Sequence, residues 1–213
     1  MRKCSADVNH IRLHGAVGEA PVYSHLNHGV EFYTFPLVVR RLSGAEDQVN
    51  VVAPLELLEC CGPLERESEL TVLGEVRTFN NRTGVGSRLV ISAFARELRQ
   101  EPGEDENRLE LSGTLCKTPS LRATPLGRTI CDMILAVNRR YGRADYLPCI
   151  AWGSLAHRCG GMEVGDQLRL TGRLQSRTYT KVSGDRSEER VAFEVSIMSL
   201  AAAEPAGKEE HTG

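Results

Sequence analysis

The amino-acid sequence repeats itself at an offset of 98 residues, and this repeat limits the possible folds more than any other feature. The landmarks that recur are, in pairs, Asn9 and Asn107, Gly15 and Gly113, Pro21 and Pro119, and Gly74 and Gly172. In the middle of the repeat the offset increases by one residue, so that residues 38–41 align with residues 137–140. A period of this length is that of a whole small domain, so the 213 residues are predicted to hold two copies of one domain.

The residues between the two copies are typical of a solvated linker. Residues 100–107 carry four acidic side chains and no basic one, together with Pro102 and Gly103. We therefore expect an N-terminal domain at 1–99, an acidic linker at 100–107, a C-terminal domain at 108–200 and a flexible tail at 201–213.

The second copy has the period-2 alternation of β-strands. From Gln167 onward, leucines fall on one face, and arginines with Tyr179 fall on the other. The expected strands are 108–115, 129–138, 146–152, 167–179 and 190–200. Residues 153–160 lack strand alternation and suit a short helix, as do residues 54–61 of the first copy. The sequence therefore predicts an all-β protein of two tandem OB-fold barrels, each with five strands and a short helix between strands 3 and 4.

Positive charge is concentrated in the second copy. The chain as a whole has a formal net charge of −2. Residues 1–99 have a net charge of −1 and the linker −4, whereas residues 108–200 carry 14 basic and 9 acidic side chains. An anionic partner is therefore expected to meet the second barrel.

Aromatic and basic side chains are combined on the expected outer face of the second copy. Single-stranded nucleic acid binds to aromatic rings on which bases stack and to cations that contact the phosphates. The aromatic candidates are Tyr141, Tyr146, Trp152 and Tyr179. The basic candidates are Arg139, Arg140, Arg143, Arg169, Arg173 and Arg177. One such aromatic residue is more often a packing residue, but the combination favours a nucleic-acid surface.

Five segments of the second copy resemble the bacterial single-stranded DNA-binding protein (SSB) family, in that family's order and spacing. The segments are 107–113, 124–127, 135–141, 151–153 and 170–179. The resemblance implies an OB-fold barrel that binds single-stranded DNA without strong sequence preference, in replication, recombination or repair. It also implies that bases stack at the positions of Tyr141, Tyr146, Trp152 and Tyr179.

The first copy departs from that pattern. Leu42 stands near the position of Tyr141, and the other three stacking positions hold Gln48, Pro54 and Asn81. Glu75 replaces Arg173. We therefore expect the first barrel to act mainly in assembly, with weaker DNA contacts from Arg77 and Phe79.

The resemblance also bears on partners. Four barrels usually assemble in the family, so a chain with two barrels is expected to form a homodimer, with a mass of two chains by light scattering. Residues 205–213 lack the acidic, apolar tip with which the family recruits replication proteins, so recruitment by that route is not expected.

Other features exclude several classes of function. No apolar run is long enough to cross a membrane, and no secretion signal follows the basic N-terminus. The seven cysteines include no C-x-x-C pair, and no catalytic or phosphate-loop motif is present. The sequence predicts a cytoplasmic, nucleoid-associated protein that is not an enzyme and that needs no metal or cofactor.

Two other interpretations stay open at this stage. One is a replication-restart or plasmid accessory OB protein, or a purely structural module, that acts mainly through protein contacts. The other is RNA as the ligand, because stacking alone does not exclude a 2′-hydroxyl. Binding to nucleic acid should weaken steeply with salt, whereas a protein interface should respond less.

Overall fold

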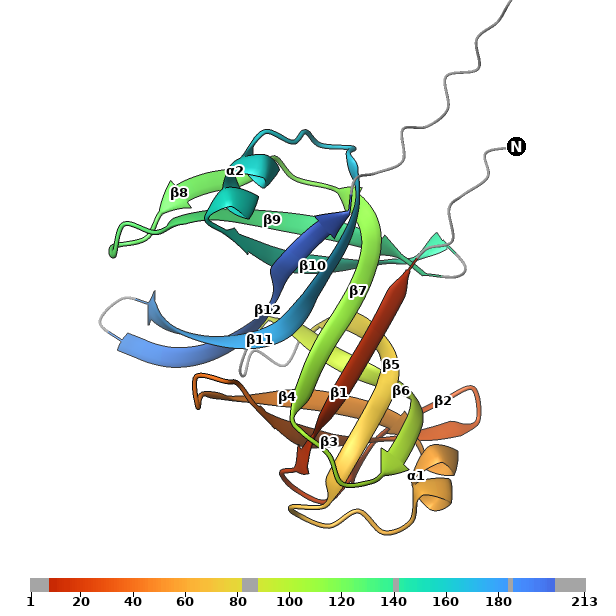
Figure 1. The fold of residues 1–213 in the computed structure, drawn as a ribbon. Helices are drawn as coiled ribbons and strands as arrows, with labels where there is room; N and C mark the ends of the chain where they lie inside the picture. Colours follow the sequence, from red (N-terminus) through yellow and green to blue (C-terminus); the bar gives the residue numbers. More distant parts are fainter. Residues whose placement is uncertain (1–7, 82–87, 140–141, 184–185, 202–213) are drawn as a thin grey trace, which may run out of the picture.

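The computed structural model describes residues 8–81, 88–139, 142–183 and 186–201, which form two similar β-barrels joined side by side (Figure 1). Barrel 1 consists of β1 to β6 with α1, and barrel 2 of β7 to β12 with α2. In the described residues, no helix is long and apolar enough to span a membrane.

In the part of the chain that the structure describes, each barrel contains six strands and one short helix. Barrel 1 is built from β1 (Asn9–Val17), β2 (Val22–Asn27), β3 (Val30–Arg40), β4 (Glu46–Pro54), α1 (Leu55–Cys61), β5 (Glu69–Asn80) and β6 (Leu89–Gln100). Barrel 2 is built from β7 (Glu106–Leu115), β8 (Ser120–Ala123), β9 (Thr129–Asn138), β10 (Ala144–Trp152), α2 (Ser154–Gly160), β11 (Gln167–Ser183) and β12 (Arg186–Ala201).

The predicted fold class, two tandem OB-fold barrels with a short helix in each, is confirmed. The difference is one additional strand per barrel, β2 in the first and β8 in the second, so that each helix follows the fourth strand. Both additional strands are exposed along their whole length, so their sequences lack the alternation that reveals a half-buried strand.

The strand order is the same in the two barrels, read outward from their junction. Read in this direction, the order is β1-β5-β6-β4-β3-β2 in barrel 1 and β7-β11-β12-β10-β9-β8 in barrel 2. Pairing of β1 with β3 closes barrel 1, and pairing of β7 with β9 closes barrel 2. Inward-facing aliphatic side chains fill both barrels, among them Leu13, Leu37, Leu111 and Leu135.

The barrels are joined by antiparallel pairing of β1 with β7 (Figure 1). At the centre of this pairing Ile11 lies opposite Leu109, its own counterpart in the repeat. The pairs on either side are exchanged in the same way, Asn9 with Leu111 and Leu13 with Asn107. This is the pattern of a two-fold symmetric, self-complementary interface, here formed within one chain.

The repeated landmarks have structural roles that explain their spacing. The side chain of Asn9 pairs with the backbone of Val76 at 2.8 and 2.9 Å, and Asn107 pairs in the same way with Leu174 at 2.7 and 2.9 Å. A Cβ atom at Gly15 would lie 2.2 Å from the carbonyl oxygen of Val38, so the chains approach too closely for a side chain.

The structure corrects the expected increase of the offset in the repeat. Val39 pairs with Asp47 in barrel 1, and Val137 pairs with Asp145 in barrel 2, so the offset stays at 98 through these strands. Arg41, rather than Arg40, is therefore the counterpart of Arg139. The linker is also shorter than expected, because β6 extends to Gln100 and β7 begins at Glu106.

Two buried aspartates connect the barrels reciprocally. Asp145 of barrel 2 is 0% exposed and accepts hydrogen bonds from the backbone and hydroxyl of Thr78 of barrel 1, at 2.5 and 3.0 Å. Arg139 binds both oxygens of Asp145 and donates to the carbonyl of Thr78 at 3.0 Å. Arg77 also reaches Asp145, at 3.3 Å.

Asp47 of barrel 1, which is 1% exposed, makes the matching contacts. Ser176 of barrel 2 donates its backbone N–H and hydroxyl to Asp47, both at 2.7 Å. Arg41 binds both oxygens of Asp47 and donates to the carbonyl of Ser176 at 3.0 Å. The two clusters therefore place the end of β5 against β10 and the middle of β11 against β4.

Candidate nucleic-acid interface

The outer face of barrel 2 is formed by β9, β10, β12 and β11, in that order. On β10, even-numbered residues point outward, and this places Tyr146 and Trp152 on the same face, 54% and 39% exposed. The two rings are six residues apart along one strand, a separation of about 20 Å. Both predicted aromatic side chains are therefore accessible from solvent on this face.

Tyr179 lies on β11 at the end of the face that also holds Tyr146. β10 pairs in parallel with β12 at Ile150 and Ser196, and Ser196 pairs with Arg173 of the antiparallel β11. Because β11 runs the opposite way, moving along it from Arg173 to Tyr179 leads toward the start of β10, where Tyr146 lies. Trp152 marks the opposite end.

The arginine next to Tyr179 is held in place by a buried acid. The guanidinium of Arg177 lies over the Tyr179 ring at 5.8 Å from its centroid. Arg177 also pairs with Glu194 at 3.4 Å, and Gln175 donates to the same carboxylate at 3.1 Å. Glu194 is only 8% exposed, so it lies beneath the face rather than on it.

The other predicted cations differ in their exposure and in their partners. Arg173 is half-buried, and its Nε has no hydrogen-bond partner in the described part of the chain. Arg169 is exposed, with Glu110 at 3.9 Å. Arg143 is also exposed, and its backbone carbonyl accepts a hydrogen bond from the backbone N–H of Arg139. Arg169 and Arg173 thus lie on the outer side of β11, and Arg143 is exposed just before β10.

Arg139 has a different environment from the other predicted cations. Its guanidinium is occupied by Asp145 and the Thr78 carbonyl, so its contacts hold the two barrels together. Tyr141 and Arg140, which were predicted to follow it in the binding surface, lie outside the described residues.

The corresponding face of barrel 1 contains few of these groups. Gln48, Pro54 and Asn81 stand at the places of Tyr146, Trp152 and Tyr179. Arg77, a predicted weaker contact, pairs with Glu75 and reaches Asp145. Phe79, the other one, is 50% exposed and follows Thr78, which bonds Asp145.

The two interbarrel aspartates were not singled out in the sequence. The signal was present, because an arginine and an aspartate six residues apart occur in both copies, as Arg41 with Asp47 and Arg139 with Asp145. A charged pair that occurs at the same spacing in both repeats indicates a structural role. The partners in the other barrel have no such signal.

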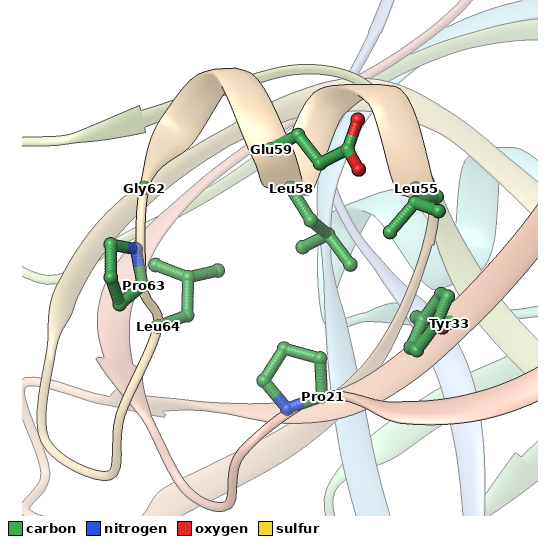
Figure 2. A pocket seen from close by; sticks show the side chains of 8 residues that line it. All are labelled: Pro21, Tyr33, Leu55, Leu58, Glu59, Gly62, Pro63 and Leu64. Atoms are coloured by element: carbon green, nitrogen blue, oxygen red, sulfur yellow. The ribbon is translucent and has the colours of Figure 1, made fainter.

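A surface pocket of about 430 Å³ lies in barrel 1 between α1 and the loops beside it (Figure 2). Its lining residues are Pro21, Tyr33, Leu55, Leu58, Glu59, Gly62, Pro63 and Leu64. This lining includes one aromatic ring and no basic side chain, so it lacks the groups that contact phosphates.

Comparison with known proteins identifies a family for barrel 2. The model of the single-strand binding protein family matches residues 106–200, which is barrel 2. A single-stranded DNA-binding protein of Clostridium tetani is 36% identical over 101 residues, which cover 43% of this chain and 70% of the relative. Single-stranded DNA-binding protein A of Bacillus subtilis is 36% identical over 87 residues, which cover 38% of this chain and 51% of the relative.

Two solved structures resemble the whole chain rather than one barrel. The wild-type single-stranded DNA-binding protein of Thermus aquaticus has a TM-score of 0.72 and 23% identity, and the match covers 92% of each chain. A deletion mutant of the same protein has a TM-score of 0.75, with 97% of this chain covered. The arrangement of two barrels in one chain is thus a known fold.

Proposed function

The chain belongs to the single-strand binding protein family, and from this membership we propose that it binds single-stranded DNA through the outer face of barrel 2. Its role is in replication, recombination or repair, where single strands are exposed. The observation that carries the proposal is the exposure of Tyr146 and Trp152 on one face, with Arg169, Arg173 and Tyr179 on the same face.

Base stacking supplies the part of binding that does not depend on sequence. Every base has a flat aromatic face, so rings such as Tyr146 and Trp152 accept any of them. Arginines at intervals along β11 neutralise the phosphates between the stacked bases. Duplex DNA keeps its bases stacked inside, so it cannot use these rings.

The fluorescence of Trp152 provides the test, because it is the one tryptophan of the chain. We expect quenching when oligo-dT is added, because a base stacks on the indole ring, and little change with duplex DNA of the same length. Absence of quenching, together with no gel shift of labelled oligo-dT, would refute the proposal.

Salt dependence separates this function from that of an accessory protein that acts mainly through protein contacts. Neutralisation of three phosphates predicts that the logarithm of the affinity falls with the logarithm of salt concentration with a slope of about −2 for single strands. A slope near zero would favour the accessory role. The same titration with oligo-U shows whether RNA competes as a ligand.

Assembly of two chains into a homodimer with four barrels belongs to the same proposal. Light scattering is expected to give the mass of two chains in the absence of DNA. A mass of one chain, about 23.4 kDa, would contradict it.

A further inference from the structure

Barrel 1 carries a row of ring and guanidinium groups across its outer face that lies outside the family's stacking positions. His25 of β2 stacks on Phe32 of β3, with ring centroids 5.0 Å apart and planes 12° from parallel. Phe32 in turn contacts Phe94 of β6 at 5.5 Å. The guanidinium of Arg96 lies over the Phe94 ring at 5.0 Å from its centroid. We call these four residues the barrel 1 strip.

The strip surrounds the place where barrel 1 lacks the counterpart of Trp152. Phe32 pairs with Pro54 as Ile130 pairs with Trp152 in barrel 2. Phe94 pairs with Val52 as Ser196 pairs with Ile150. Barrel 2 thus has one ring in the middle, at Trp152, whereas barrel 1 has a proline there and a ring on each side.

The outer members of the strip are accessible and already held in place. His25 is exposed, and its Nδ1 lies 3.0 Å from the hydroxyl of Ser24. The side chain of Arg96 is 57% exposed and pairs with Glu75 at 3.2 Å. Imidazole rings and guanidinium planes are both groups on which nucleic-acid bases stack. Side chains that are fixed before binding lose less conformational entropy when a ligand arrives.

The strip also connects to the face of barrel 2 through charged residues. Glu75 contacts both Arg96 and Arg77, and Arg77 reaches Asp145, the residue before Tyr146. Phe79, half exposed, lies on β5 beside this junction. The ion pairs from Arg96 through Glu75 and Arg77 therefore link the strip to Asp145, next to Tyr146 in the chain.

We propose that barrel 1 binds single-stranded DNA through the barrel 1 strip, with bases stacked on His25 and on Arg96, as a continuation of the path over barrel 2. This inference rests on the proposed function, because it needs a strand already bound to barrel 2. It assigns barrel 1 a binding surface at positions different from those of barrel 2.

A relocated fluorescent reporter tests the strip directly. In a Trp152→Phe background, which keeps an aromatic ring in barrel 2, His25→Trp places the sole tryptophan on the strip. Oligo-dT of about 30 nucleotides, longer than one barrel occupies, is expected to quench it. The matched control is Tyr23→Trp in the same background. Tyr23 lies on the same β-strand and is 57% exposed, but a register shift separates it from His25. Its ring packs with Tyr33 and not with the strip, so no quenching is expected there.

The outcomes separate the two proposals. The inference is supported if all variants bind labelled oligo-dT and the tryptophan is quenched at position 25 but not at position 23. The inference is overturned if oligo-dT binds and quenches Trp152 of the wild type but leaves the fluorescence of the tryptophan at position 25 unchanged. The proposed function is unaffected by that result. No binding by the wild-type protein refutes the proposed function itself.

Loss of the exposed groups gives a second measurement. The His25→Ala and Arg96→Ala double variant is expected to bind the oligonucleotide of about 30 nucleotides at least tenfold more weakly, and one of about 8 nucleotides as tightly as the wild type does. Tyr23→Ala with Arg66→Ala, two exposed residues away from the strip, is the control with unchanged binding. Equal affinities of the two double variants for the longer oligonucleotide would overturn the inference.

Discussion

Replacement of Asp145 by alanine is expected to lower the free energy of unfolding by about 3 to 5 kcal/mol, because it removes the buried acceptor of Arg139 and of the Thr78 backbone N–H. The carboxylate is fully buried and also binds the backbone of Thr78 in the other barrel. The loss should be measured by urea unfolding followed by circular dichroism.

Two comparisons make this prediction specific. Asp47→Ala should cause a loss of similar size, because Asp47 binds Arg41 and Ser176 in the same arrangement. Asp132→Ala is the control, since Asp132 pairs with Arg122 on the exposed surface of barrel 2, where such a pair contributes about 0 to 1 kcal/mol. Equal losses in all three variants would contradict the structural role of the buried pair.

Acidification should lower the free energy of unfolding, as these substitutions do. Burial alone would raise the pKa of Asp145, but hydrogen bonds from Arg139 and Thr78 and the charge of Arg139 outweigh it, so the pKa is lowered. The pKa of Asp47 is lowered in the same way by Arg41 and Ser176. Their contribution is therefore present above the ordinary aspartate pKa of about 3.9 and is lost as the pH falls from there through the lower folded-state values. Urea midpoints of the wild type should fall over this range more steeply than those of an Asp47→Asn and Asp145→Asn double variant.

The second large effect concerns binding. Tyr146→Ala combined with Trp152→Ala should weaken binding of oligo-dT by about 2 to 6 kcal/mol, because each lost stacking platform costs about 1 to 3 kcal/mol. Fluorescence anisotropy of a labelled oligonucleotide measures this without the tryptophan. Both side chains are exposed, so the unfolding transition should change little.

The control for this variant is another exposed aromatic residue. Tyr23→Ala removes a ring that is 57% exposed on barrel 1, away from both binding surfaces. It should change the affinity less than twofold. Nearly normal affinity of the Tyr146 and Trp152 double variant would show that the bound DNA does not cross β10.

Much of the fold follows from local sequence patterns. The alternation along 167–179 and 190–200 marks β11 and β12, and the loss of alternation at 54–61 and 153–160 marks both helices. The additional strands β2 and β8 escaped prediction because they have no buried side. Pairing of β1 with β7 also has no sequence signal of its own, because each strand is apolar enough for the interior of a single barrel.

The candidate site could be predicted only in part. Parity along a strand places Tyr146 and Trp152 on one face without any knowledge of the neighbouring strands. The partners of an arginine depend on the whole fold, and Arg139 binds a residue 61 positions away in the other barrel. The barrel 1 strip was not predicted, because His25, Phe32 and Phe94 come from three strands and meet only when the sheet forms.

The pairing of β1 with β7 is kept when the protein is diluted, and it joins two surfaces whose sequences can differ. The two barrels are connected by the few residues between Gln100 and Glu106, so each sees its partner at a high effective concentration, in the millimolar range for a short linker, whatever the amount of protein in solution. In a pair of identical chains every substitution occurs on both faces at once. Here Glu75 and Arg173 occupy matching positions with opposite charges, so covalent fusion lets the two surfaces differ in charge within one molecule.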